Sequence, residues 1–341
     1  MKCTNKISMN KADSNKKNIH KKLTAGCILA AALVLTGCGS GSFEMPYDSS
    51  YPVSSFQLVQ GEQQQYTVTP FAADLCVVDG DVSKPGVTID EVGAAALFDL
   101  ANHETLYAKN ANTQIHPASL TKIMTALVAL KYGSPDDVLK ASENVIVTES
   151  GAVLCGIKPG DSMTLDQALH ILLIYSANDV AILIAEGVGG TVEGFTELMN
   201  KEAQALGATN CNFLNPNGLT EEGHYVTAYD LYLIFAEAVK YDLFNEIIQM
   251  PSYTTTYMKA DGTQMAFDKQ STNGYVRGDI QMPENITVIG GKTGTTKAAG
   301  HCLILLSRNS SGNPYISVIM NSDSTENLYD KMSELLNSIN Q

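Results

Sequence analysis

The segment His116–Leu130, with the sequence HPASLTKIMTALVAL, has almost no polar positions after its first turn. A helix that is apolar on nearly every side has to be enclosed by other elements, so this one should lie inside a domain core. We predict a helix from about Ala118 to Tyr132, with Gly133 as its stop signal. A chain of 341 residues that is 44% hydrophobic and 17% charged is large and apolar enough to form that core.

Ser119 and Lys122 lie three positions apart at the beginning of this helix. Side chains at that spacing are neighbours, with about 5–6 Å between their Cβ atoms, so the lysine amine can reach the serine hydroxyl. The S-x-x-K pattern is not specific by itself, because two further matches occur within the first 20 residues. Ser119 could also simply cap the helix. The rest of the chain has to decide between these two roles.

The segments around this helix predict one mixed α+β domain with an antiparallel sheet built from both ends of the chain. A β-hairpin precedes the helix, with its turn at Asn102–Glu104. The final helix has Lys331 as its only base, which favours packing on the sheet over binding to a membrane surface. The predicted strands are 93–101, 105–111, 252–258, 287–290, 302–307 and 315–320, and the further predicted helices are 165–175, 179–186, 192–206, 227–241 and 325–339.

Two more motifs are candidates for the same site as Ser119. Ser176-Ala177-Asn178 interrupts two apolar helical runs, and Lys292-Thr293-Gly294 lies at the start of a predicted strand. The pattern S-x-N recurs at six other serines, whereas K-T-G occurs once. Each motif also has a structural alternative, as a cap between two helices or as a glycine at a bulge.

The order S-x-x-K, S-x-N, K-T-G is that of penicillin-binding proteins and class A β-lactamases. The resemblance extends to the stretches LYAKNAN, SANDVA, GFTELMNKEAQALGATNCNFLNPNGL, TAYDL and GGKTGTTKAAG. From about Gly93 to the C-terminus, the chain resembles the low-molecular-mass D-alanyl-D-alanine carboxypeptidases, a family of penicillin-binding proteins. The resemblance implies an α+β, β-lactamase/DD-peptidase-like fold, with a five-stranded antiparallel sheet and an all-helical subdomain.

The resemblance also implies a role for each motif residue. Ser119 is expected to be the nucleophile, Lys122 its base, and Ser176 the relay of a proton to the leaving amine. Lys122 can be a base only if its amine is neutral near pH 7, and burial together with a second nearby cation, Lys292, would lower its pKa. The expected substrate-binding groups are Asn178 for the peptide amide, Lys292 and Thr293 for the terminal carboxylate, Gly294 for close approach of a substrate strand, and the backbone N–H groups of Thr295 and Ser119 for the oxyanion hole.

The chain departs from the family pattern in two ways. Relatives often carry an arginine just before the last helix that helps to hold the carboxylate, whereas Ser322–Tyr329 contains none. Recognition is therefore expected to rest more on Lys292 and Thr293, unless the substrate terminus differs. About 47 residues follow Gly294, so we expect neither the β-rich second domain nor the amphipathic C-terminal anchor of many relatives.

The first 37 residues are predicted to be a lipoprotein signal peptide. Lysines precede an apolar run at 23–35, and the sequence LTGC that ends at Cys38 resembles a bacterial lipobox. Lipid on Cys38 would anchor the protein to the cell membrane on its extracytoplasmic side. An uncleaved anchor is the alternative, although the apolar run is shorter than the ~20 residues that span a bilayer. We expect residues 38–66 to be a flexible tether, 67–92 to be an N-terminal extension that could add a strand, and 93–341 to be the DD-peptidase catalytic domain.

Composition argues against several other classes. The chain has a net charge of −14 and only two arginines, so it has no basic stripe for nucleic acid. The six histidines have no ligand-like spacing, so we expect no metal site, and the expected chemistry needs no cofactor. After Cys38 the cysteines are Cys76, Cys155, Cys211 and Cys302, for which we expect buried free thiols, although an even number permits disulfides.

The sequence thus predicts a serine-type D-Ala-D-Ala carboxypeptidase that removes the terminal D-alanine from peptidoglycan stem pentapeptides through an acyl-Ser119 intermediate. β-Lactam antibiotics are expected to acylate the same serine as covalent inhibitors. Two alternatives stay open. One is a β-lactamase, which would need a carboxylate base for deacylation, and the other is a non-catalytic sensor of β-lactams or peptidoglycan on the same fold.

Overall fold

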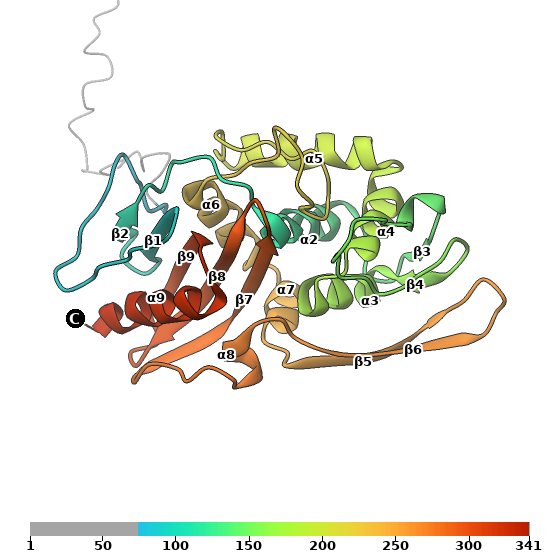
Figure 1. Cartoon of the computed structure of the whole chain (residues 1–341). Helices are drawn as coiled ribbons and strands as arrows, with labels where there is room; N and C mark the ends of the chain where they lie inside the picture. The colour runs from blue at the N-terminus through green and yellow to red at the C-terminus, as the bar shows by residue number, and fades with distance from the viewer. Residues whose placement is uncertain (1–73, 341) are drawn as a thin grey trace, which may run out of the picture. The chain divides into compact units, whose positions relative to one another are not determined.

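The main sheet of the protein has five antiparallel strands in the order β2-β1-β9-β8-β7. The computed structural model describes residues 74–340, and in it the early strand β1 pairs with the late strand β9 (Figure 1). The predicted sheet, built from N- and C-terminal segments, is therefore confirmed. Its strands are β1 (Ala94–Asp99), β2 (Glu104–Lys109), β7 (Ile286–Thr296), β8 (Gly300–Asn309) and β9 (Pro314–Ser322).

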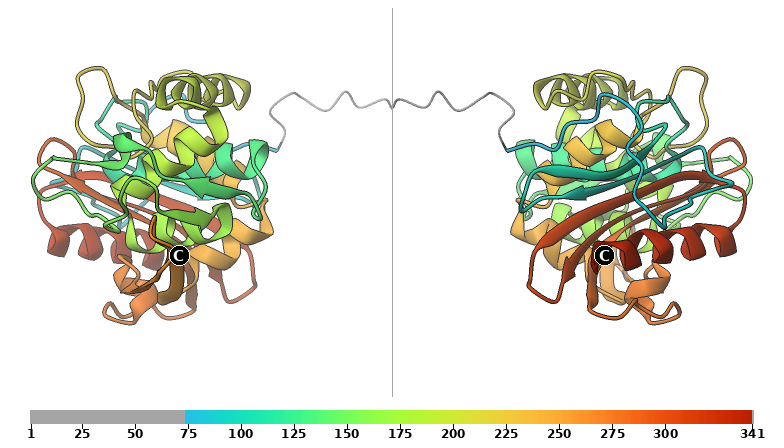
Figure 2. Two further views of the ribbon diagram at one scale, coloured as in Figure 1. Left: turned by 90° about the vertical axis from the view of Figure 1, so that its right-hand side faces the viewer. Right: turned by 90° about the vertical axis from the view of Figure 1, so that its left-hand side faces the viewer.

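Helices cover both faces of this sheet. One face carries α9 (Thr325–Asn337), and α6 (Ala228–Ala238) lies on the other with α2 (Thr121–Tyr132) packed against it (Figures 1 and 2). Because both faces are covered, β8 and β9 are buried along most of their length and appear in the sequence as continuous apolar runs. The predicted packing of α9 on the sheet is confirmed by its buried residues Leu328, Met332, Leu335 and Leu336.

The predicted central helix is α2, which is buried without interruption from Thr121 to Ala129. Its predicted start at Ala118 is wrong, because Ala118 has a φ of +47°, outside the right-handed helical region. Residues Ala118–Leu120 form a separate 3₁₀ turn, η2. The predicted helix 165–175 is also two elements, since α3 (Leu165–His170) continues as the π-helical turn η4 (Ile171–Tyr175).

Of the remaining helices, two pack against α2 and two contact the edge strand β7 of the main sheet. The two helices that pack against α2 agree with the predicted runs 179–186 and 192–206 to within a few residues at each end. The predicted helix 227–241 ends earlier, and a further helix follows it. The bounds are α4 (Asn178–Gly189), α5 (Val192–Ala205), α7 (Asp242–Ile248) and α8 (Gly274–Arg277), with 3₁₀ turns η3 (Glu143–Val145) and η5 (Ser338–Asn340).

The helical part of the domain is not all-helical, because it also carries a four-stranded sheet in the order β3-β4-β5-β6. Its strands are β3 (Val138–Lys140), β4 (Ser162–Thr164), β5 (Ser252–Met258) and β6 (Gln264–Gln270). Only β5 was predicted. The first two strands are three residues long, too short to show an alternating pattern, and β6 has one buried residue, Phe267.

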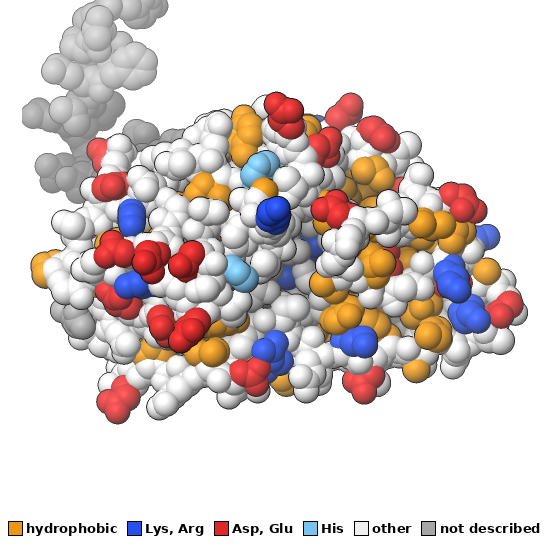
Figure 3. Space-filling model, in the orientation of Figure 1, with side chains coloured by type: hydrophobic (Ala, Val, Ile, Leu, Met, Phe, Trp, Pro, Cys, Tyr) orange, Lys and Arg blue, Asp and Glu red, His pale blue; other side chains and the backbone are white. Residues whose placement is uncertain are grey.

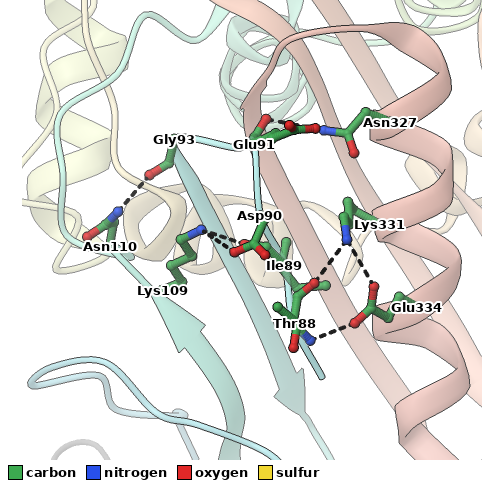
Figure 4. Close-up of polar contacts among 10 residues, drawn as sticks. All are labelled: Thr88, Ile89, Asp90, Glu91, Gly93, Lys109, Asn110, Asn327, Lys331 and Glu334. Carbon is green, nitrogen blue, oxygen red and sulfur yellow. Dashed lines mark hydrogen bonds and ion pairs between the residues drawn. The ribbon is translucent and has the colours of Figure 1, made fainter. Parts of the chain in front are cut away.

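Residues 74–92, the described part of the N-terminal extension, run along the domain surface. We call this segment the strap. Val82 makes a single antiparallel bridge to Ala108 at the edge strand β2, so the extension adds a bridge and not a strand. Ile89 is buried against α9 and the sheet. Figure 4 shows the polar contacts that accompany it, from Lys109 on β2 to the Ile89 carbonyl and from Lys331 on α9 to the Thr88 carbonyl.

Two further expectations concern the anchor and the cysteines. The leader, Cys38 and the tether lie outside the described residues. Within residues 74–340, no helix is both long and apolar enough to cross a bilayer. The four later cysteines are all free thiols, as expected, but only Cys76 and Cys302 are fully buried, whereas Cys155 and Cys211 are half-buried.

Candidate active site

Ser119 lies in the turn η2, directly before α2. The preceding Ala118 has a positive φ, which is strained for a residue other than glycine. Two glycines from distant segments, Gly218 and Gly294, pack closely against this turn. A Cβ atom on Gly218 would lie 1.8 Å from the carbonyl oxygen of Ala118, and one on Gly294 would lie 3.0 Å from the backbone nitrogen of Ser119. Tertiary packing through these glycines therefore holds Ala118 in its strained conformation and sets the position of Ser119.

Lys122, on the first turn of α2, is completely buried, and its Nζ lies 3.0 Å from Ser119 Oγ. Nζ also donates to Asn178 Oδ1 at 2.8 Å and to the carbonyl oxygen of Asn217 at 2.6 Å. A neutral amine has two N–H bonds and one lone pair. Because the two carbonyl oxygens accept the N–H bonds, the lone pair remains available to the hydroxyl of Ser119.

The electrostatic surroundings favour that neutral form. Burial lowers the pKa of Lys122 well below its ordinary value, and the positive charge of Lys292 lowers this pKa further, while Asp179 acts in the opposite direction. Among residues 74–340, neither Lys122 nor Lys292 forms an ion pair with a carboxylate, although five other lysines do. Burial and a second cation are the two causes that the sequence predicted.

Ser176 and Lys292 form the second pair of the site. Ser176 adopts a left-handed conformation (φ +71°) where the π-helical turn η4 ends and α4 is about to begin, so the chain turns sharply there. Lys292 Nζ donates to Ser176 Oγ at 2.9 Å and to the carbonyl oxygen of Thr293 at 2.9 Å. Burial lowers the pKa of Lys292 to about 7. Both lysines of the site are thus buried, and each contacts one of the two serines.

Asn178, the first residue of α4, connects Lys122 to a loop on the helical side of the site. Its Oδ1 accepts from Lys122, and its Nδ2 donates to the carbonyl oxygen of Val153 at 3.1 Å. The neighbouring Asp179 carboxylate accepts backbone N–H bonds from Cys155 at 2.9 Å and from Gly156 at 2.7 Å. These bonds hold the loop against the beginning of α4 and fix the amide group of Asn178.

The Lys292-Thr293-Gly294 motif lies inside the edge strand β7, not at the start of a strand as predicted, because β7 runs without a break through Thr296. Gly294 also has a structural reason that the sequence did not reveal. A side chain there would meet the backbone nitrogen of Ser119 and the Cβ of Ala118, so the glycine permits β7 to pack on the turn that carries Ser119. Thr295, whose backbone N–H is the second expected oxyanion donor, follows directly in β7.

The hydroxyl of Thr293 donates to Thr272 Oγ1 at 2.6 Å. Thr272 and Tyr175, which precedes Ser176, line a polar cavity of about 540 Å³ together with Lys269 and Arg277. Figure 3 shows that this face of the molecule is hollowed between the sheet and the helical part, with a basic side chain visible inside. The site therefore opens to solvent on the side of Thr293.

Comparison with known proteins agrees with this geometry. The pattern that defines the D-alanyl-D-alanine carboxypeptidase family matches residues 82–324. The chain belongs to this family.

Two characterised relatives are carboxypeptidases by name. The D-alanyl-D-alanine carboxypeptidase DacF of Bacillus subtilis is 36% identical over 62% of the chain, and DacC of Escherichia coli is 32% identical over 69%. The chain spans 53% and 57% of those two relatives, about half of their length. Among solved structures, the DD-transpeptidase of Streptomyces K15 matches with a TM-score of 0.68 and 26% identity, covering 75% of this chain and 98% of that one. The predicted family and fold class are thus confirmed.

The structure brings together the side chains of Ser119, Lys122, Ser176, Asn178 and Lys292, and it places Thr293 and Gly294 beside them. Cys38 lies outside the described residues.

Sequence reasoning missed the carbonyl of Asn217, the hydroxyl of Thr272 and the cation Arg277. The turn Pro216-Asn217-Gly218 was a usable signal, because an Asn-Gly pair predicts a tight turn. A backbone carbonyl, however, carries no residue-specific signal. His116 contacts the carbonyl oxygen of His224 through Nδ1 at 2.9 Å.

Proposed function

We propose that this protein is a serine-type D-Ala-D-Ala carboxypeptidase that removes the terminal D-alanine from peptidoglycan stem pentapeptides. The observation that carries the proposal is the buried Lys122 amine, which lies 3.0 Å from Ser119 Oγ with its N–H bonds directed to Asn178 and Asn217. A serine hydroxyl becomes a good nucleophile when an adjacent base takes its proton. Family membership supplies the reaction class.

In the acylation step, Lys122 Nζ takes the proton of Ser119, and Oγ attacks the carbonyl carbon of the penultimate D-alanine. Negative charge develops on the carbonyl oxygen, and the backbone N–H groups of Ser119 and Thr295 are the proposed donors to it. The C–N bond then breaks. The departing amine takes, through Ser176, the proton that Lys122 received, so free D-alanine leaves and Lys122 is neutral again. Ser176 Oγ also contacts Lys292.

In the deacylation step, water attacks the ester carbon and gives one proton to Lys122. The bond to Ser119 Oγ breaks, Oγ recovers a proton, and the shortened peptide leaves as a carboxylic acid. Asn178 is the proposed partner of the peptide amide, and Lys292 with Thr293 is the proposed site for the terminal carboxylate. A carboxylate next to Lys292 would stabilise its protonated form and so keep Lys122 neutral.

The direct test is release of free D-alanine from a diacyl-Lys-D-Ala-D-Ala peptide. We expect turnover by the wild-type protein and none by Ser119→Ala. Fluorescent penicillin should label the wild-type protein at one site and leave this variant unlabelled. Labelling of the wild type without any release of D-alanine would contradict the carboxypeptidase function and favour a sensor.

β-Lactamase activity is the less favoured alternative, because the relatives by name are D-Ala-D-Ala carboxypeptidases. The acyl-enzyme formed with penicillin is therefore expected to be long-lived. Turnover of a chromogenic cephalosporin at many cycles per second would overturn this expectation.

We further propose that residues 1–37 are removed as a signal peptide and that Cys38 is lipidated, which would hold residues 93–341 outside the cell as the catalytic domain, with 38–66 as the tether. The lipobox-like sequence before Cys38 supports this. The measurement is fractionation of cells that express the full chain, with mass spectrometry of the mature N-terminus. Cys38→Ala should leave the membrane fraction, and persistence there would contradict lipid anchoring.

A further inference from the structure

His301 lies at the edge of the site, outside the motifs. It is the second residue of β8 and pairs directly with Thr295 of β7. Its Nδ1 lies 3.3 Å from Thr295 Oγ1 and 3.1 Å from the hydroxyl of Thr325, the first residue of α9. The imidazole is thus held between the end of the motif strand and the beginning of the last helix.

The alternation of the sheet brings His301 toward the proposed carboxylate site. Thr293 and Thr295 are two positions apart on β7, so their side chains share one face, and a residue paired directly with Thr295 shares that face too. Gly294, between the two threonines, packs against Ser119. His301 therefore lies within two strand positions of Thr293 and beside the segment that touches the nucleophile.

The ring has a nitrogen left for a ligand. When a threonine hydroxyl donates to Nδ1, the ring proton resides on Nε2, which is then a donor. Within residues 74–340, no carboxylate forms an ion pair with His301, whereas both Nε and Nη2 of Arg277 donate to Asp279. The segment Ser322–Tyr329, which leads into and begins α9, supplies no arginine at this end of the site.

We propose that His301 is a specificity-determining residue whose imidazole binds the C-terminal carboxylate of the substrate together with Thr293. This rests on the proposed carboxypeptidase function and deepens it. The ligand class is a peptide that ends in a free carboxylate. Thr295 and Thr325 act as positioning residues, because they orient the ring through Nδ1 and leave Nε2 for the ligand.

The test compares two peptides, diacyl-Lys-D-Ala-D-Ala as the free acid and as its C-terminal amide. The readout is the ratio of their kcat/KM values, which does not depend on the fraction of folded enzyme. A hydrogen bond to a charged group is typically strong enough for about a tenfold effect or more. We expect His301→Ala to lower the acid-to-amide ratio about tenfold or more, mainly through KM for the acid, and His301→Arg to retain the preference.

Lys297 provides a matched control, because it is an exposed cation in the turn between β7 and β8. Lys297→Ala removes a nearby positive charge and leaves the imidazole in place, so we expect its ratio to stay within twofold of wild type. An unchanged ratio in His301→Ala, or an equal loss for both peptides, would show a merely structural histidine and overturn the proposal. A wild-type protein inactive on the acid would overturn the proposed function itself, and the role of His301 with it.

Discussion

Lysines serve opposite purposes in two regions of this molecule. In the active site, Lys122 and Lys292 are fully buried and donate to uncharged oxygens. Where the strap packs on the sheet edge and α9, Lys109 of β2 and Lys331 of α9 lie nearer the surface and pair with Asp90 and Glu334 (Figure 4). The same side chain is therefore buried among uncharged acceptors in one region and a solvent-screened cation in the other.

The difference shows that burial without a paired carboxylate is what lowers the pKa of a lysine. Taking an ammonium out of water costs free energy that uncharged acceptors only partly offset, so the neutral form gains and the pKa falls. At the strap, solvent screens the charges, and such ion pairs contribute little to stability. We therefore expect the strap to be held by the buried side chain of Ile89 and not by its ion pairs.

The largest expected effect is on chemistry. Lys122→Ala removes the base next to Ser119, and a positioned base typically contributes about 10²–10⁴-fold to the rate. The rate of labelling by fluorescent penicillin should fall by that factor. Lys109→Ala is the control, a lysine of β2 beside the strap that should label at the wild-type rate. Near-native acylation of Lys122→Ala would remove Lys122 from its proposed role.

Ile89→Ala tests what holds the strap. Ile89 is 1% exposed, and removing a buried isoleucine side chain typically costs about 2–5 kcal/mol. Urea unfolding should show a loss of that size, while kcat/KM per penicillin-titrated site stays unchanged. A loss below about 1 kcal/mol would mean that the strap packs only loosely on α9.

The third prediction concerns pH and Lys292. Its pKa is about 7 in the folded protein, and an unfolded lysine has a pKa of about 10.4. Between these values the unfolded chain binds more protons, so this site makes the free energy of unfolding rise with pH, by up to about 1.4 kcal/mol per pH unit.

Lys292→Met removes this contribution. Denaturation of both proteins at pH 7.5, 8.5 and 9.5 should therefore show a steeper rise for the wild type than for the variant. Titrating groups that Lys292 does not influence cancel in the difference. Equal slopes would mean that Lys292 keeps an ordinary pKa.

The smallest effect is expected at the strap's ion pairs. Asp90 is exposed and its carboxylate lies 3.8 Å from Lys109 Nζ. Asp90→Asn should change the free energy of unfolding by no more than about 0.5 kcal/mol, and by less at high salt. A cost similar to that of Ile89→Ala would show that the strap depends on charge and would weaken the contrast between the two regions.

Much of the fold could be predicted because long apolar runs repeat with a clear period. The buried α2, the strands that build the main sheet and the final helix were all visible in this way. The four-residue α8 and the three-residue β3 and β4 were not, because an element of one turn or one pleat is too short for a periodic signal. The exposed β6 gave no apolar pattern either.

The start of α2 was mispredicted for a different reason. Local propensity allows Ala118 in a helix, but Gly218, one hundred positions away, packs so closely that a Cβ atom there would lie 1.8 Å from the Ala118 carbonyl oxygen. This packing holds Ala118 at its positive φ. The same limitation applies to Asn217 and Thr272, which act through groups that many residues share. His301 also carried no motif, and its position became visible only through its contacts with Thr295 and Thr325.

The sequence by itself determined which reactive groups this protein has and their order along the chain, because the motifs are local and the one-turn spacing of Ser119 and Lys122 follows from helix geometry. Only the tertiary structure decided that Lys122 is enclosed, that Asn178 and Asn217 accept its N–H bonds, and that Lys292 lies close enough to lower its pKa. The physical reason is that a pKa depends on solvent exclusion and nearby charge, and both are supplied here by segments about 55 to 170 positions away in the chain.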